Sequence, residues 1–379
     1  MNAALTATPQ QSVARRLDSA RAPTICSAMN YTLSQKIERW LARALLNLPD
    51  FLVRLLAGKT IVRDGLQLDP HVQLLLKLQR LSAKKLVKET ASIEQMRANL
   101  DAESNILTPA LAALEQVREL QLQGPADIIP ARLYRPPGLA APAPLLLYFH
   151  GGGYALGSLA SHDAPCRWLA LNAGCVVIAV DYRLAPEHPF PAGVDDALAA
   201  FRAVVARAAE FGIDTTRIAV GGDSAGGNLA TVVAQQVRGE ALQPCFQLLI
   251  YPTTDATLSS PSINIFASGF LLERASMVWF VNTYLPAHQD RRDPRCSPLF
   301  GEVQGLPPAL LMTAGFDPLR DEGEAYAAKL SAAGVSVDLR RYDSLVHGFL
   351  NMTGGVRAAA SAVQDAAAAL RAAFVQRPT

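Results

Sequence analysis

The sequence predicts an α/β protein whose central sheet is mostly parallel, has eight strands and is flanked by helices. From about residue 115 onward, short apolar runs alternate with helical stretches. Runs that are apolar throughout indicate strands covered on both faces, and helices between them indicate a parallel sheet. The first two runs instead alternate apolar and polar residues, as antiparallel strands do. The expected strands are 117–122, 128–133, 145–149, 175–180, 218–220, 246–250, 309–313 and 335–339.

The helices expected around these strands are 163–172, 194–209, 225–236, 319–333 and an alanine-rich helix at 357–374. A long interval follows Tyr251 before the next strand, and residues 266–284 within it have a helical pattern. A connection of that length usually holds an inserted element. We place this insertion at about 256–300 and expect residues 111–379 to form one α/β domain around it.

The segment 30–110 has helical periodicity and almost no strand signal. Its first helix is expected from an apolar face formed by Leu33, Ile37, Trp40, Leu41 and Leu45. Further helices are expected at 70–81 and 91–100, the second with Thr90 as its N-cap. The segment is therefore expected to be a helical part that precedes the α/β domain.

A basic stripe of Lys36, Arg39 and Arg43 lies opposite the apolar face of the first helix. Basic amphipathic helices can bind membrane surfaces. We favour a solvated helix face over that alternative, because surface helices of globular proteins commonly carry such charges.

Composition limits the classes of protein to which the chain can belong. Half of the 379 residues are hydrophobic and 18% are charged, the balance of a globular protein. The net charge of +2 shows no large excess of basic residues, so the composition gives no indication of nucleic-acid binding. The five cysteines are odd in number and share no paired spacing, which argues against a disulfide framework or a zinc site and favours a cytoplasmic location.

No segment of the sequence is expected to span a membrane or to direct secretion. No apolar run reaches the roughly 20 residues needed to cross a bilayer. Residues 1–29 lack the apolar stretch of a secretory signal. We expect them to be a variable, disordered tail, with Met29 as an alternative start.

The sharpest motif is Gly222-Asp223-Ser224-Ala225-Gly226, between the expected strand 218–220 and the expected helix 225–236. A G-x-S-x-G sequence in this strand–turn–helix context is a nucleophile elbow. The turn is so tight that only glycine fits two residues before and after the serine. The helix behind Ser224 directs its free N–H groups and the positive end of its dipole at a developing oxyanion.

A second motif, His150-Gly151-Gly152-Gly153, follows the expected strand 145–149 directly. Consecutive glycines let the backbone approach a substrate closely. We expect the N–H groups of Gly152, Gly153 and Ala225 to form an oxyanion hole. His150 is expected to orient this loop and not to carry a proton.

A serine nucleophile needs a base and an acid, in the chain order serine, acid, histidine for such a fold. His347 and His288 are the histidines that follow Ser224, and His288 lies in the expected insertion. His347 falls between the last strand and the last helix and is the expected base. The expected acid is Asp317, just after the strand 309–313. Asp321 and Glu322 are rivals that we expect to face solvent or cap the next helix, and Asp255 and Asp343 are weaker candidates.

These motifs resemble those of the hormone-sensitive-lipase-like esterases, the bacterial family IV of the α/β-hydrolase fold. Residues 150–153 correspond to their HGGG, 222–227 to their GDSAGG elbow and 181–187 to their DYRLAPE segment. Residues 317–321 correspond to the acid motif and 347–349 to the histidine motif. Five motifs occur in order between about 115 and 350, and no catalytic position departs from the pattern.

The resemblance implies a helical cap built from the segment 30–110 and the insertion 256–300. Such a cap would form the acyl pocket, with Phe266, Phe270, Leu271, Trp279 and Phe280 either lining it or packing in the core. The segment 181–187 is expected to be structural, with Arg183 paired to Glu187.

The motifs therefore predict a serine carboxylesterase that works through an acyl-enzyme, and the resemblance implies that it hydrolyses short- to medium-chain acyl esters. The alternatives are a related serine hydrolase or acyltransferase acting on amides, lactones or carbamates, and a catalytically inactive receptor, which would not need an intact triad. We expect a small-molecule ester as substrate, no metal or cofactor, no nucleic-acid partner, and leave a homodimer open.

Overall fold

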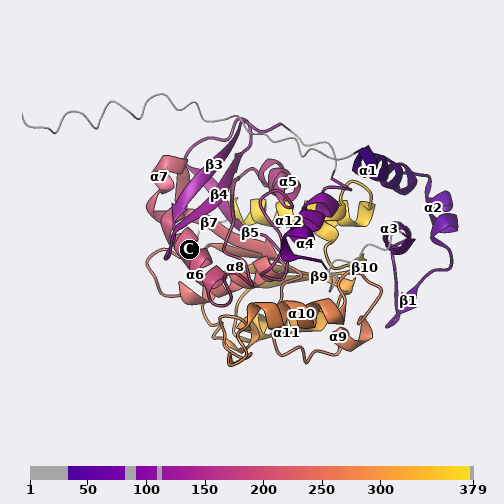
Figure 1. Ribbon diagram of the computed structural model, residues 1–379. Coiled ribbons are helices and arrows are strands. Elements are labelled where there is room, and N and C mark those ends of the chain that lie inside the picture. The colour runs from indigo at the N-terminus through magenta and orange to yellow at the C-terminus, as the bar shows by residue number, and fades with distance from the viewer. Residues whose placement is uncertain (1–32, 82–90, 109–112, 376–379) are drawn as a thin grey trace, which may run out of the picture.

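The computed structural model describes residues 33–81, 91–108 and 113–375, so the expected tail 1–29 and the expected cap Thr90 lie outside the described residues. An eight-stranded sheet runs through the molecule in the order β10-β9-β8-β7-β5-β6-β4-β3 (Figure 1). Strand β4 runs opposite to the rest of the sheet, so its pairings with β3 and β6 are antiparallel and the other pairings are parallel. The predicted fold class is confirmed. The strands are β3 (Gln116–Gln123), β4 (Ile128–Arg135), β5 (Ala143–Phe149), β6 (Val176–Val180), β7 (Ile213–Asp223), β8 (Phe246–Ile250), β9 (Ala309–Phe316) and β10 (Val337–Val346).

Helices cover both faces of this sheet, which explains why its central strands are apolar on both sides. One face packs against α5 (Asp163–Ala173) and α12 (Arg357–Val375). The other packs against α6 (Ala192–Ala206), α8 (Ala225–Gln236) and α11 (Arg320–Ala332). The helix expected at 194–209 is divided, because α6 ends before Arg207 and the short α7 (Ala208–Phe211) follows it.

Two strands run well beyond their predicted ends. Glycine disfavours strands, so the sequence placed the end of β7 before Gly221. The ladder nevertheless continues, because Gly221 pairs with Tyr148 and Leu248 on either side. β10 forms one edge of the sheet, where polar residues are tolerated on both faces. A search for apolar runs therefore found only its beginning.

The N-terminal helices are α1 (Leu33–Leu46), α2 (Asp50–Ala57), α3 (Pro70–Leu81) and α4 (Ile93–Ser104), and α3 has the predicted bounds. The true N-cap of α4 is Ser92, whose hydroxyl accepts from the Gln95 N–H while the Gln95 side chain accepts from the Ser92 N–H. Figure 1 shows α1, α2 and α3 gathered at one end of the molecule and α4 lying over the sheet.

A small hairpin of β1 (Val62–Arg63) and β2 (Leu66–Gln67) interrupts these helices and was not predicted. Its two turn residues, Asp64 and Gly65, both have positive φ. An Asp-Gly pair is a strong hairpin signal, but each strand has only two residues, which is too short to show the alternation of apolar and polar residues that predicts a strand.

The insertion after β8 contains α9 (Ser262–Ile265) and α10 (Arg274–Tyr284), and not one helix over 266–284. The short 3₁₀ helix η1 (Pro298–Phe300) lies at the end of this insertion, and η2 (Phe349–Met352) follows β10. No helix within the described ranges is long and apolar enough to cross a bilayer.

The orientation of α1 differs from the predicted one. Trp40, expected on the packed face, is 68% exposed, whereas Leu46 is 2% exposed in the core. Arg43, expected in solvent, points inward and donates to the carbonyl oxygens of Ile106 and Thr108. The expectation of a solvated basic stripe is therefore wrong for Arg43. The side chains of Leu33 and Lys36 lie outside the described part of the chain.

Substitutions on α1 test this orientation. Leu46→Ala should lower the free energy of unfolding by about 2–5 kcal/mol, because it leaves a cavity in the core. Trp40→Ala should change it by less than about 0.5 kcal/mol, since its side chain is mostly in water. Urea unfolding of both variants measures the difference, and a larger loss for Trp40→Ala would contradict the observed orientation.

Candidate active site

Three predicted site residues each follow the end of a strand directly. Ser224 follows β7, Asp317 follows β9 and His347 follows β10. These strands are parallel, so their carboxyl ends lie at one edge of the sheet, where α/β proteins place their sites. The structure therefore brings together three residues that are far apart in the sequence.

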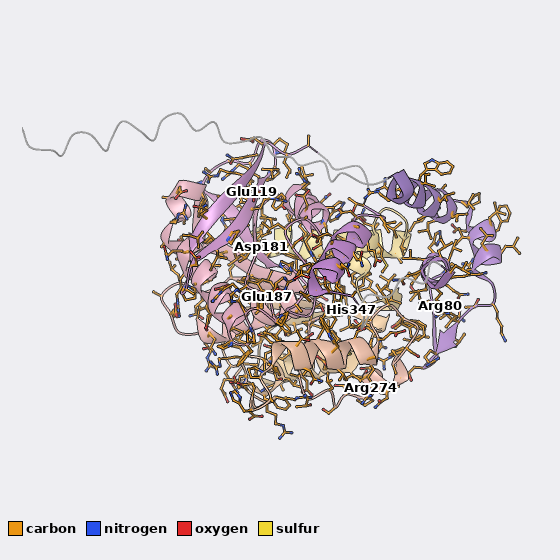
Figure 2. All side chains as sticks on the ribbon, viewed as in Figure 1. Arg80, Glu119, Asp181, Glu187, Arg274 and His347 are labelled. Atoms are coloured by element: carbon orange, nitrogen blue, oxygen red, sulfur yellow. The ribbon has the colours of Figure 1, made fainter. Side chains whose placement is uncertain are left out.

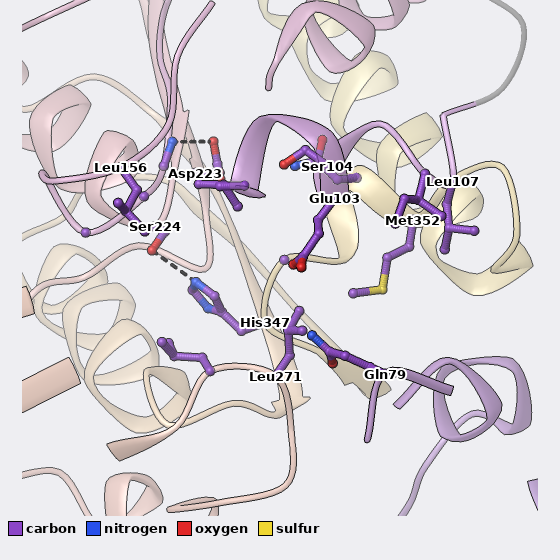
Figure 3. A pocket seen from close by; sticks show the side chains of 18 of the residues that line it. Gln79, Glu103, Ser104, Leu107, Leu156, Asp223, Ser224, Leu271, His347 and Met352 are labelled. Atoms are coloured by element: carbon purple, nitrogen blue, oxygen red, sulfur yellow. Dashed lines mark hydrogen bonds between the residues drawn. The ribbon is translucent and has the colours of Figure 1, made fainter. Parts of the chain in front are cut away.

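The three side chains form one chain of hydrogen bonds. His347 Nε2 lies 3.0 Å from Ser224 Oγ (Figure 3). On the other side of the ring, His347 Nδ1 lies 2.8 Å from Asp317 Oδ2. Both distances are those of ordinary hydrogen bonds. The arrangement can move a proton from the serine hydroxyl to the imidazole while the carboxylate fixes the imidazole tautomer.

Ser224 occupies a strained turn between β7 and α8. Its φ of 55° is rare for a residue with a side chain. A Cβ on Gly226 would overlap the carbonyl oxygen of Phe149, and a Cβ on Gly222 would overlap both that oxygen and Gly226. Glycine at these two positions lets α8 begin directly against β5, which projects the Ser224 hydroxyl above the sheet edge.

Asp317 is held in place from two sides. Its side chain is fully buried, and its second oxygen, Oδ1, accepts from the Leu319 N–H at 2.9 Å. Asp321, the nearest rival, instead accepts from Arg320 Nε and from the Ser262 N–H. Of these two carboxylates, only that of Asp317 contacts His347.

Glu322 was expected to face solvent or cap the helix, and this expectation is wrong. The residue is fully buried, and its Oε1 accepts from the backbone N–H groups of Thr254 and Asp255. Burial raises the pKa of Glu322 well above its usual range. It therefore supports the start of the insertion.

The weaker candidates contact other groups. Asp255 accepts from the Thr257 N–H, and Asp343 pairs with Arg341. His288 is exposed in the turn after α10.

The glycines of the loop after β5 line the same cavity as Ser224. Gly152 and Gly153 have φ of 123° and 61°, values that favour glycine. Within the described part of the chain, the N–H groups of Gly152, Gly153 and Ala225 donate to no other protein group. They are thus the available donors beside the serine hydroxyl.

A buried carboxylate joins this loop to the elbow. Asp223 Oδ1 accepts from the Gly151 N–H at 3.0 Å and from the Tyr148 hydroxyl at 2.6 Å, and His162 Nε2 lies 3.1 Å from it. Burial alone would raise the pKa of Asp223, but His162 and the two hydrogen bonds hold it below its usual value. The sequence indicated Asp223 and Gly151 as motif residues, whereas no local pattern identified Tyr148 or His162.

His150 has the orienting surroundings that were expected of it. Its ring stacks on that of Tyr182 at 4.5 Å, and its carbonyl oxygen accepts from the Tyr182 hydroxyl at 2.8 Å. Burial, together with the nearby His162, lowers the pKa of His150 to about 4. A neutral, buried imidazole at this place supports the loop.

The expected pair between Arg183 and Glu187 is not formed. Arg183 binds Asp196 with a distance of 2.7 Å from Nη2 to Oδ1. Glu187 binds Arg97 of α4, and the shorter of the two contacts measures 2.7 Å. Figure 2 shows Glu187 beside α4. The segment 181–187 thus contacts α6 through Arg183 and α4 through Glu187.

The cavity above Ser224 has a volume of about 460 Å³ and is mainly apolar. Of the five expected lining residues, Leu271 and Phe280 line it. Phe266 and Phe270 pack in the core against Phe316, and Trp279 packs on Phe280 away from the cavity. Further lining comes from the segment 30–110, which was expected to help form the pocket although none of its residues was named, and from the segment after His347. It includes Leu41, Leu45, Leu75, Leu78, Leu100, Leu107 and Met352, the last two of which are labelled in Figure 3.

Within the described residues, no cluster of three or more His, Cys, Asp or Glu side chains is arranged to hold a metal ion. The four cysteines in that part of the chain, Cys166, Cys175, Cys245 and Cys296, are free thiols, and Cys26 lies outside it.

Comparison with known proteins agrees with this architecture. Residues 146–351 match the α/β-hydrolase fold family. The chain is 46% identical over 324 residues to the carboxylic ester hydrolase LipN of Mycobacterium tuberculosis, covering 83% of this chain and 86% of LipN. It is 49% identical over 231 residues to an ethyl acetate hydrolase of Pseudomonas putida, covering 59% of this chain and 72% of that protein.

Solved structures give the same result. An ester hydrolase from the metagenome of Lake Arreo, solved with a derivative of bipyridine phosphonate, is 43% identical with a TM-score of 0.78. The similarity covers 82% of this chain and 100% of that one. An esterase of Pyrobaculum calidifontis is 38% identical with a TM-score of 0.75, over 82% and 100% of the two chains. The chain therefore belongs to the α/β-hydrolase fold family, in the group of hormone-sensitive-lipase-like esterases whose motifs its sequence carries.

The lowered pKa of His150 predicts a specific pH dependence of stability. Between about pH 6.5 and pH 4 the unfolded chain takes up a proton on this imidazole that the folded protein does not, so stability falls as the pH falls. His150→Gln should reduce this loss by on the order of 3 kcal/mol.

Urea unfolding of both proteins at pH 7.5 and pH 4.5 measures the difference. The exposed residue His188 provides the control, and His188→Gln should leave the pH dependence of the wild type unchanged. An equal pH dependence in the wild type and His150→Gln would contradict a neutral, buried His150.

Proposed function

We propose that this protein is a serine carboxylesterase that hydrolyses short- to medium-chain acyl esters through Ser224, His347 and Asp317. The observation that carries the proposal is the unbroken chain of hydrogen bonds from Ser224 Oγ to the Asp317 carboxylate, at the floor of an apolar cavity. The names of the relatives, which include an ethyl acetate hydrolase and a carboxylic ester hydrolase, support an ester as substrate.

In the first step, Ser224 Oγ attacks the ester carbonyl carbon while His347 Nε2 accepts the hydroxyl proton. Asp317, bound to His347 Nδ1, keeps the imidazole in the tautomer that leaves Nε2 free to accept. The imidazolium then protonates the departing alcohol. A water molecule, deprotonated by His347 in the same way, attacks the acyl carbon. The imidazolium then returns this proton to Ser224 Oγ as the carboxylic acid leaves.

The negative charge that develops on the carbonyl oxygen needs fixed donors. The N–H groups of Gly152, Gly153 and Ala225 are proposed to supply them. Gly152 and Gly153 line the cavity, Ala225 directly follows Ser224, and none of the three N–H groups donates to another described group. One donor of this kind contributes on the order of 2.7–4 kcal/mol to the activation barrier. Ala225 also begins α8, so the positive end of that helix dipole faces the same oxygen.

Removal of the nucleophile tests the proposal. Ser224→Ala should lower kcat for a nitrophenyl ester by roughly 10⁴-fold or more, leaving only what binding and the oxyanion hole supply. Ser331→Ala, an exposed serine on α11, is the matched control and should keep the wild-type rate. Turnover by Ser224→Ala at the wild-type rate would refute the proposed mechanism.

The size of the cavity limits the acyl chain. Each methylene that enters an apolar pocket contributes about 0.8 kcal/mol. Once the cavity is full, further carbons stay in water or clash with its walls. The walls include Leu41, Leu75 and Leu100 from the N-terminal helices and Leu271 and Phe280 from the insertion. We therefore propose that these two segments act together as a cap over the pocket.

The proposed cap predicts a profile of chain length. The value of kcat/KM on nitrophenyl esters should rise by up to about fourfold per methylene and be highest at acyl groups of about four to eight carbons. Deletion of residues 1–29 should leave the profile unchanged. Deletion through about residue 60 removes Leu41 and Leu45 and should broaden the profile or abolish activity. A preference for long-chain triglyceride emulsions with interfacial activation would contradict the prediction.

A further inference from the structure

One polar stripe of α4 contacts the segment that continues the oxyanion loop. Arg97, Asp101 and Asn105 are spaced four residues apart, so they share one face of α4 and its C-cap. Arg97 Nε donates to the Ala155 carbonyl oxygen at 2.9 Å. Asp101 Oδ1 accepts from the Ser158 hydroxyl at 2.6 Å. The stripe is completed by Asn105, whose Nδ2 donates to the carbonyl oxygen of Ala160 at 3.2 Å.

Ser158 is the junction between α4 and the loop. Its hydroxyl oxygen accepts from the N–H groups of Ala160 and Ser161, each at 3.1 Å. Its own N–H donates to the Ser161 hydroxyl oxygen at 2.9 Å. The contact with Asp101 therefore fixes a closed turn and not a single side chain.

From this turn, buried polar contacts lead to the oxyanion glycines. The Ser161 hydroxyl lies 2.9 Å from His162 Nδ1, and the opposite ring nitrogen lies 3.1 Å from Asp223 Oδ1. The same oxygen accepts the Gly151 N–H. Ser161, His162 and Asp223 are all buried. A continuous path thus joins α4 to the loop that carries Gly152 and Gly153.

The neighbouring side of α4 is a wall of the cavity. Leu100, Glu103 and Ser104 line the pocket above Ser224. One helix therefore both lines the cavity and contacts the segment that continues the glycine loop. Arg97 also secures α4 to the catalytic domain, because it donates to the Ala185 carbonyl oxygen at 3.0 Å and to Glu187.

We propose that α4 is a positioning element of the oxyanion hole, acting through Asp101 and Ser158 on the turn that continues the glycine loop. This inference rests on the proposed function, because it assigns the glycine N–H groups to a developing oxyanion. Oxyanion donors act only when they lie about 2.7–3.1 Å from that oxygen. A small shift of the turn therefore slows the chemical step without changing the walls that bind the acyl chain.

The test is the separation of kcat from KM. Asp101→Ala removes the acceptor of Ser158 and should lower kcat about tenfold with KM unchanged within about twofold, because the donors are shifted and not lost. Asp101→Asn keeps an oxygen at the same place and should restore most of the rate. Glu94→Ala, an exposed acid on the same helix, is the control and should keep wild-type kinetics.

A second readout reports on the oxyanion itself. A thionoester carries sulfur in place of the carbonyl oxygen and gains less from N–H donors. The ratio of ester to thionoester rates should therefore fall in Asp101→Ala and stay constant in Glu94→Ala. Should Asp101→Ala fail to fold by circular dichroism, Ser158→Ala removes the same contact from the other side and is expected to show the same loss of kcat.

The outcomes separate the two proposals. A rise in KM with unchanged kcat, or no change at all, in a folded Asp101→Ala or Ser158→Ala protein would overturn the role of α4. If Ser224→Ala is inactive in the same assay, that result leaves the proposed function standing. Turnover by Ser224→Ala would instead remove the proposed function, and the inference with it.

Discussion

The whole site depends on the close approach of α8 to β5 behind Ser224. Gly222 and Gly226 permit it, because a Cβ at either position would overlap the Phe149 carbonyl oxygen. That approach has two consequences. It holds Ser224 at a φ of 55°, which directs its hydroxyl to the edge of the sheet. There Ser224 Oγ lies 3.0 Å from His347 Nε2. The same approach also brings the first N–H of α8 beside the glycine loop that leaves β5.

The remaining groups are supplied by strand ends and fixed by buried polar contacts. β9 and β10 each stop one residue before Asp317 and His347, so sheet geometry sets the spacing of these two side chains. The glycine loop has no regular structure of its own. It is held instead by Asp223, by the stacked rings of His150 and Tyr182, and at its far end by α4. The fixed strand ends and the contacts that hold the loop would keep the proposed oxyanion donors in place before a substrate binds.

Local patterns in the sequence were sufficient for the interior strands of the sheet and for the three residues that the structure brings together at its edge. The strands of the sheet interior are apolar throughout. The glycines of the serine motif and of the loop after β5 indicate tight turns, so these motifs predict their own backbone geometry. The edge strand β10 was mostly missed because its residues are polar, and the face of α1 was misjudged because Arg43 finds carbonyl partners inside the protein. Contacts such as His162 with Asp223, or Glu187 with Arg97, join residues distant in sequence and leave no periodic signal.

The central claim is that the elbow presents one reactive serine. It is tested most directly by treating the protein with a fluorophosphonate probe and locating the adduct by mass spectrometry of the digested chain. A single adduct on Ser224, lost on heat denaturation before labelling, is the result that the geometry predicts. An adduct on another serine, with Ser224 unmodified, would contradict it.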